Sequence, residues 1–226
     1  MTLLIPKYDL RIKIQENEVN VLCIENPDAY SYIIKNLWQQ VNGEDGEMIL
    51  SEGEKELKIS KDMELITNPF AVDCNDKKIL NKVYIELAEN FKENYMMEMS
   101  DINTNIVNVL DELMSDFSYP LASDIEMDPI GLFKLYRIQM DMAKEDYVSY
   151  LLEYMKLKHM ICKVNVFVIV DLRSYMDDIV IEELYKNLFY EKIFLIVISG
   201  HQYENPIECE KTLILDKDLC IIKSYD

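Results

Sequence analysis

The stretch Val166-Phe167-Val168-Ile169-Val170-Asp171 decides the fold of this chain, because five apolar residues in a row lead directly into an acid. A second apolar run, Ile193 to Ile198, follows after the length of one helix and ends at Ser199-Gly200. Apolar runs that are joined through a helix are typical of parallel strands buried on both faces. The sequence therefore predicts an α/β protein with a mainly parallel sheet.

Asp171 stands where P-loop nucleotide-binding proteins place a carboxylate that helps to hold magnesium. Such proteins also need a GxxxxGK[ST] phosphate loop after an earlier strand, and the sequence does not contain one. The turn where phosphate would sit, residues 25–28, carries Glu25 and Asp28, whose carboxylates would repel phosphate. We therefore predict a P-loop-like α/β head domain without a Walker A motif, in which Asp171 is the polar end of a strand.

Composition and charge narrow the function further. The 226 residues include 42 acids and 23 bases, which gives a formal charge of −19. A field of this sign opposes general binding to nucleic acid, so any DNA function must use local basic patches. No apolar run reaches the length of a membrane span, and the scattered, odd-numbered cysteines indicate reduced thiols. We expect a cytoplasmic protein that does not enter a membrane.

The order of predicted elements indicates two domains. Strands are expected near residues 9–14, 18–24, 48–50, 57–59 and 64–67, with a helix that starts at Pro27. Residues 75–159 show helical periodicity, and strands return near residues 164–170, 193–198, 212–215 and 220–222. We therefore assign residues 1–72 and 161–226 to the α/β head domain, and residues 73–160 to an inserted α-helical leg domain.

An acidic loop in the helical region is a candidate cation site. The window from Asp101 to Asp128 holds seven acids and no lysine or arginine, and it ends with Asp124, Glu126 and Asp128 on alternate residues. Calcium takes six to eight oxygen ligands and accepts flexible loops, and Glu112 and Asp116 on the preceding helix could complete its shell. The alternative is an acidic loop that is simply solvated.

The bases are few enough to consider one by one. The candidate DNA-binding bases fall in two places, one just after the acidic loop and one around the last helix of the helical region. They are Lys134, Arg137, Lys144, Lys156, Lys158 and Lys163. A single copy of this set binds nucleic acid weakly, whereas several copies around a common axis would bind more strongly. The alternative is an ordinary charged surface.

Catalytic residues are hard to find in this sequence. The two histidines, His159 and His201, belong to no visible triad, zinc pattern or Cys–His pair. No pair of carboxylates is singled out for hydrolysis. We therefore expect a protein that is not an enzyme.

The ordered segments of the chain resemble those of one known family. They are Val21–Asn26, Leu65–Asn68, Val72–Asn75 followed by Ile79-Leu80, Val166–Val170, Phe194–Ile198 and Leu213–Asp218. In order and spacing they are similar to the short form of the Csn family ("Csn-two"), CRISPR-associated adaptation proteins of type II-A systems. The family's strand-to-helix opening likewise lacks a P-loop.

This resemblance implies a P-loop-like head with a helical leg, assembled as a ring-shaped homotetramer. It implies calcium-dependent binding of the ends of double-stranded DNA, without nucleotide hydrolysis. The role implied is an accessory one in spacer acquisition for antiviral defence, alongside the CRISPR integrase proteins and the RNA-guided nuclease.

The resemblance also implies roles for individual residues. Asp124, Glu126 and Asp128 fall on the family's acidic loop, which carries calcium ligands, and Lys134 matches a lysine just after it. Lys158 and Lys163 lie near a lysine cluster before the core strand, although Met160, Ile161 and Cys162 occupy positions where relatives have lysines.

Two other hypotheses stay open at this point. One is a P-loop-fold enzyme that hydrolyses nucleotides or nucleic acid with Asp171 and magnesium. The other is an acidic protein-binding adaptor that never contacts DNA.

Overall fold

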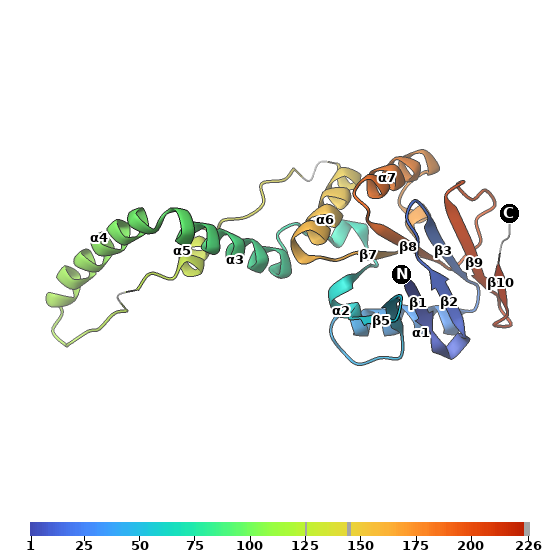
Figure 1. Ribbon diagram of the computed structural model, residues 1–226, viewed down its shortest axis with the longest axis horizontal. Coiled ribbons are helices and arrows are strands. Elements are labelled where there is room, and N and C mark those ends of the chain that lie inside the picture. The colour runs from blue at the N-terminus through green and yellow to red at the C-terminus, as the bar shows by residue number, and fades with distance from the viewer. Residues whose placement is uncertain (125, 144–145, 224–226) are drawn as a thin grey trace. The chain divides into compact units, whose positions relative to one another are not determined.

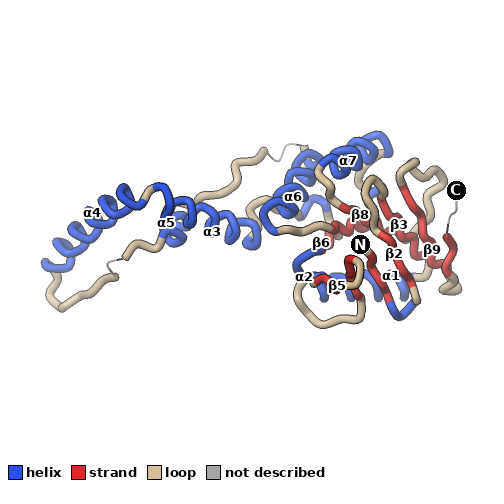
Figure 2. Tube along the Cα trace, viewed as in Figure 1, coloured by secondary structure: helices blue, strands red, loops and turns tan. Residues whose placement is uncertain are grey.

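The computed structural model describes residues 1–124, 126–143 and 146–223, and the chain divides into two compact units. The first unit consists of Met1–Cys74 with Met142–Asp226, and the second of Asn75–Asp141. All described strands belong to the first unit, whereas the described part of the second consists of helices and loops (Figure 2). We call them the α/β unit and the helical unit.

The α/β unit is built on a six-stranded sheet with the order β10-β9-β3-β8-β7-β6. Its strands are β3 (Val19–Ile24), β6 (Met63–Ile66), β7 (Val166–Val170), β8 (Phe194–Ser199), β9 (Glu210–Leu215) and β10 (Ile221–Lys223). All neighbouring strands run parallel except β10, which pairs antiparallel with β9. The predicted mainly parallel sheet is confirmed.

Both faces of this sheet are covered, as the apolar runs indicate. All five residues of β7 are buried, and Phe167 and Val168 on opposite faces are fully so. On one face, Val168 and Ile196 join a core with helix α1 (Pro27–Val41). The other face is covered by α6 (Tyr147–Cys162) and α7 (Asp178–Tyr190) (Figure 1). Uninterrupted apolar strands form here because neither face meets water.

A second, antiparallel sheet of order β2-β1-β4-β5 packs into the core beside α1. Its strands are β1 (Thr2–Ile5), β2 (Leu10–Lys13), β4 (Ile49–Glu52) and β5 (Lys55–Leu57). The sequence did not predict β1, because a four-residue run is too short to show a period. Leu3 and Ile5 of β1 nevertheless lie buried in the core.

Shorter helices complete the α/β unit, and the start of α1 follows its sequence signals. The remaining elements are the helix α2 (Ile59–Asp62) and the 3-10 turns η1 (Pro6–Tyr8), η2 (Pro69–Ala71) and η3 (Leu172–Ser174). At α1, the Asn26 side chain accepts hydrogen bonds from the backbone N–H groups of Asp28 and Ala29, and Pro27 takes the first helical position. Both features are typical helix starts.

Helix α6 lies in the α/β unit, whereas the sequence-based boundary placed residues up to 160 in the leg domain. Six of its residues are buried, among them Tyr154, Met155 and Lys158. The Tyr154 hydroxyl donates to Glu64 of β6 at 2.9 Å. Helical periodicity cannot tell which domain a helix packs against, and here the wide apolar surface of α6 packs within the α/β unit.

The helical unit contains α3 (Lys77–Asn94), α4 (Met96–Ser115) and α5 (Pro129–Leu135). Its described core is small and consists of Tyr84, Ala88 and Phe133, with Leu80, Phe91 and Ile130 packed against it. The Asn75 side chain joins the two ends of the unit, since its amide donates to Met140 O and its oxygen accepts from Met140 N. None of the 20 residues of α4 is buried.

Candidate functional site

The acidic loop begins at the end of α4, and its last acid, Asp128, caps the helix that follows. Asp128 caps α5: Oδ1 accepts from Ile130 N at 3.0 Å and Oδ2 from Gly131 N at 2.9 Å. Gly131 permits this approach, because a Cβ there would stand 2.8 Å from Asp128 Oδ2. Both carboxylate oxygens of Asp128 therefore already serve the helix start.

The other predicted calcium ligands are exposed and spread out. Glu112 lies in the last turns of α4, and Asp116 is the residue that follows the helix rather than part of it. Asp124 and Glu126 lie in the loop, exposed to solvent. Among the described residues, no three His, Cys, Asp or Glu side chains gather closely enough to hold a metal ion. The described acids of this single chain therefore do not form a calcium site in the geometry seen here.

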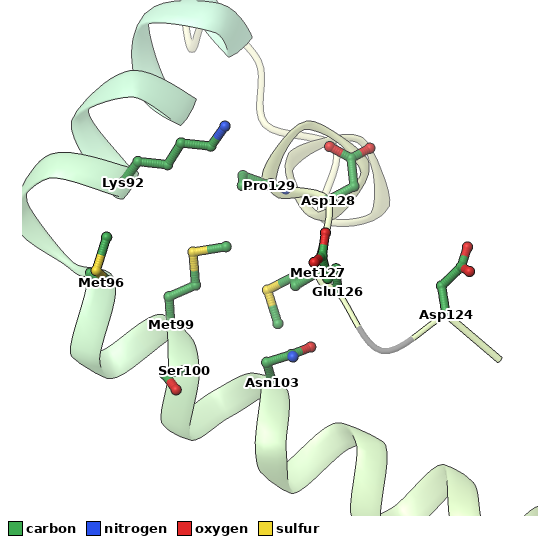
Figure 3. A pocket seen from close by; sticks show the side chains of 10 residues that line it. All are labelled: Lys92, Met96, Met99, Ser100, Asn103, Asp124, Glu126, Met127, Asp128 and Pro129. Carbon is green, nitrogen blue, oxygen red and sulfur yellow. The ribbon is translucent and has the colours of Figure 1, made fainter.

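The loop instead forms one wall of a groove of about 980 Å³ within the helical unit. The opposite wall comes from the end of α3 and the first turns of α4 (Figure 3). The lining residues are Lys92, Met96, Met99, Ser100, Asn103, Asp124, Glu126, Met127, Asp128 and Pro129. The acids of the groove were predicted from the sequence, whereas its methionines were not. Their signal was the helical spacing of Met96, Met99 and Asn103, together with a methionine between two acids of the loop.

Two predicted DNA-binding bases belong to the helical unit. Lys134 lies in the last turn of α5, whereas Arg137 follows the end of that helix in the left-handed region, at φ 51°. Arg137 therefore lies beyond the helix, which ends at Leu135. Both side chains remain exposed to solvent.

The predicted bases of the α/β unit differ in exposure. Lys156 is partly buried and pairs with Glu153 at 3.1 Å. Lys163 is exposed, ends α6 in a left-handed conformation, and donates to Met160 O at 2.8 Å. Lys144 lies outside the described residues.

Lys158 is not available to DNA, which corrects its assignment as a DNA-binding residue. Its side chain is 1% exposed, and its ammonium lies 3.5 Å from a Glu64 carboxylate oxygen. The Tyr154 ring lies 5.3 Å from the same ammonium. A buried lysine needs such a partner, because an unpaired charge is costly away from water. Lys158 therefore attaches α6 to β6.

Asp171, at the end of β7, is held by internal partners. Its carboxylate accepts from the Tyr30 hydroxyl at 2.7 Å and from Gly200 N at 3.4 Å. Burial and the Asp171 carboxylate raise the pKa of the Tyr30 hydroxyl, which therefore stays protonated as the donor. The first free N–H groups of α1 are capped by Asn26. These contacts fit a structural role for Asp171.

A buried charge network close to α7 was also missed by the sequence analysis. Arg173 donates to Glu210 at 2.9 Å, and the Tyr185 hydroxyl donates to the same carboxylate at 2.9 Å. Burial and Glu210 raise the pKa of Tyr185. Arg173 also stacks on the ring of Tyr203, 4.2 Å away. These contacts fasten the segment between β8 and β9, and nothing in the local sequence pairs these residues.

Comparison with protein families gives a clear result. The model of the CRISPR-associated protein family Cas_Csn2 matches residues 40–219 of this chain. The chain belongs to the Csn2 family of CRISPR-associated proteins. The match spans the last two residues of α1, the whole helical unit and the strands β4 to β9, and it leaves out β1, β2, β3 and β10. The resemblance noted in the sequence is thereby confirmed, and a CRISPR-associated role follows from membership.

Other comparisons add less to this Csn2-family assignment. A solved structure described as an ABC transporter ATP-binding protein from Pyrococcus furiosus is 11% identical, with a TM-score of 0.38, and the match covers 90% of this chain and 88% of that one. A likeness at this level does not establish a shared fold or activity. Comparison with curated proteins finds no match. No helix in the described part of the chain is long and apolar enough to span a membrane.

Proposed function

We propose that this Csn2-family chain is a non-catalytic accessory protein of CRISPR spacer acquisition, which forms a ring-shaped homotetramer and binds ends of double-stranded DNA. The integrase proteins and the RNA-guided nuclease are its proposed partners. The main observation in support of this assembly is an exposed apolar stripe on α4. It is formed by Ile102, Ile106, Val109, Leu110 and Leu113, which are 37–65% exposed.

This stripe supports assembly because its residues recur at helical spacing on one side of a helix that buries nothing in its own chain. Contiguous apolar patches of this kind on soluble proteins mark interaction surfaces. A second copy offers the same stripe and can pack against it in a symmetric contact.

DNA binding is proposed to depend on that assembly. The exposed bases Lys134, Arg137 and Lys163 are too few in one chain to offset a formal charge of −19. Four copies around one axis would bring these bases together while the acidic outer surface faces solvent. Binding at the interior of a closed ring would favour linear over closed circular DNA, because a ring is threaded from an end.

The experiment compares gel shifts with linear and closed circular duplexes and measures the oligomer by analytical ultracentrifugation. Lys134→Glu with Arg137→Glu should abolish binding to linear DNA. The control is Lys186→Glu with Lys211→Glu, at two exposed lysines of the α/β unit, which changes the net charge by the same amount at other positions. Equal binding of linear and circular DNA, or equal loss in the control, would contradict the proposal.

Calcium dependence is proposed separately. It requires the acidic loop to rearrange around the ion, since the described carboxylates do not converge in one chain. Asp124 and Glu126 are the proposed ligands with free carboxylates, alongside Glu112, Asp116 and Asp128. Titration calorimetry with Ca²⁺ should show binding that Asp124→Asn with Glu126→Gln removes and Asp101→Asn leaves intact. The absence of heat in the unaltered protein would end this part of the proposal.

The hydrolase alternative gains no support from Asp171, whose carboxylate faces Tyr30 and Gly200. It predicts that a nucleotide with magnesium raises the melting temperature, and that Asp171→Asn removes the effect. We expect no shift in either protein.

A further inference from the structure

We propose that the groove of the helical unit binds a basic amphipathic helix from a partner protein. This inference goes beyond the proposed ring and DNA functions and depends on neither of them. It combines two properties of the groove, an apolar lining rich in methionine and a rim of carboxylates, which occur together on surfaces that accept such helices.

The apolar lining comes from both walls of the groove. Met96 and Met99 lie on the helical wall and Met127 on the loop wall, with Pro129 at one end (Figure 3). Methionine is unbranched and polarisable, so methionine-lined surfaces adapt to side chains of different shapes. The lining therefore fits a row of apolar side chains along one face of a helix.

The rim of the groove is negatively charged, as DNA is. Asp124, Glu126 and Asp128 contribute three carboxylates against the single ammonium of Lys92 among the lining residues. Between Lys92 and Lys134 the chain carries nine acids and no lysine, arginine or histidine. Phosphate would be repelled by this segment, whereas lysine and arginine side chains that flank an apolar helix face would pair with the rim.

The groove and the stripe of α4 proposed for assembly are different surfaces of the helical unit. The exposed stripe of α4 proposed for assembly points elsewhere. At 100° per residue, its mean direction lies roughly 90° around the helix axis from that of Met96, Met99, Ser100 and Asn103. The two surfaces can therefore serve different partners.

The probe for this proposal is a fluorescent amphipathic peptide of leucine and lysine, about 18 residues long, which spans about 27 Å as a helix. Its counterpart has the same leucine positions with glutamate for lysine. Fluorescence anisotropy is measured with the full chain in EDTA. The lysine peptide should bind at least about tenfold more tightly than the glutamate peptide, and its binding should weaken with added salt.

Two neighbouring methionines give a matched pair of variants. Met96 lines the groove and is 69% exposed, whereas Met97 is 82% exposed and does not line it. Met96→Lys should weaken binding of the lysine peptide by about tenfold or more, because it places an ammonium in the apolar lining of the groove. Met97→Lys adds the same charge and should change binding less than about twofold. Both positions are exposed enough that folding should survive, which circular dichroism checks.

Several results would overturn the proposal. Equal affinity for the two peptides would mean nonspecific apolar adhesion. If the lysine peptide does not bind, the groove does not accept basic amphipathic helices. Equal effects of the two variants would place the site elsewhere. A change in oligomeric state caused by Met96→Lys but not by Met97→Lys would show that a second copy covers the groove. Failure of DNA binding or ring formation leaves these outcomes unaffected.

Discussion

The two units of this chain differ in how much of their apolar surface they bury. In the α/β unit, both faces of the six-stranded sheet are covered, and β7 and β8 are almost wholly buried. In the helical unit, the described core consists of Tyr84, Ala88 and Phe133, while α4 leaves its apolar residues in solvent. The α/β unit is stabilised by its own packing, and the helical unit exposes the surfaces that partners could bind.

The largest expected difference between the units lies in backbone protection. Amides of β7 and β8 should exchange hydrogen at least about 10³-fold more slowly than those of α4, because buried strands open only with global unfolding. Hydrogen exchange followed by mass spectrometry at low protein concentration measures this ratio. Equal protection at that dilution would show that the helical unit has a stronger core than its packing indicates. Protection of α4 that grows with concentration would instead support assembly through its stripe.

A matched pair of phenylalanines tests the same comparison in free energy. Phe167 in β7 is fully buried, and Phe117 just after α4 is 60% exposed. Phe167→Ala should lower the free energy of unfolding by about 3–5 kcal/mol, because it leaves a cavity. Phe117→Ala should change it by less than about 0.5 kcal/mol. Urea unfolding followed by circular dichroism gives both values, and similar losses would contradict the comparison.

A buried and an exposed lysine extend the comparison of the two units to the loss of a charge. Lys158→Met should lower the free energy of unfolding by about 1–3 kcal/mol, because Glu64 loses its buried partner. Lys134→Met, at an exposed position of α5, should leave stability within about 0.5 kcal/mol. In gel shifts the order should reverse, with Lys134→Met the more damaging to DNA binding. A stability loss at Lys134 as large as that at Lys158 would place Lys134 in a structural role.

The smallest expected effect concerns the cap of α5. Asp128→Ala should destabilise the start of this helix by about 1 kcal/mol, whereas Asp128→Asn should retain most of the capping. Faster hydrogen exchange within α5 in the alanine variant alone is the expected result. Asparagine keeps one acceptor oxygen, so equal loss of protection in that variant would show that the cap needs the second carboxylate oxygen or its charge.

Local patterns predicted much of the fold of the α/β unit. The apolar runs that became β7 and β8 follow from burial on both faces, and the start of α1 follows from Asn26 and Pro27. The prediction was wrong where it needed distant contacts. Periodicity assigned α6 to the leg domain, because a helical pattern does not show which element each face packs against. The cluster of bases around this helix assigned Lys158 to DNA binding, whereas its side chain is buried.

The candidate site was predicted less completely than the fold. The sequence located the acidic loop, yet Asp128 proved to be a helix cap, and Arg137 lies beyond the end of its helix. The methionines of the groove were missed, since Met127 and Met99 come together only through the return of the chain beside α4. The proposed calcium ligands and DNA contacts stay predictions.

The sequence by itself determined the strand that ends at Asp171, the missing phosphate loop, the clustering of acids between Lys92 and Lys134, and the resemblance to the Csn2 family. These properties depend only on consecutive residues or on the order of segments along the chain. Only the tertiary structure decided that Asp171 faces Tyr30, that Lys158 is buried with Glu64, and that a methionine-lined groove lies beside the acids. Such pairings join residues far apart in the chain, and only packing brings them within contact distance.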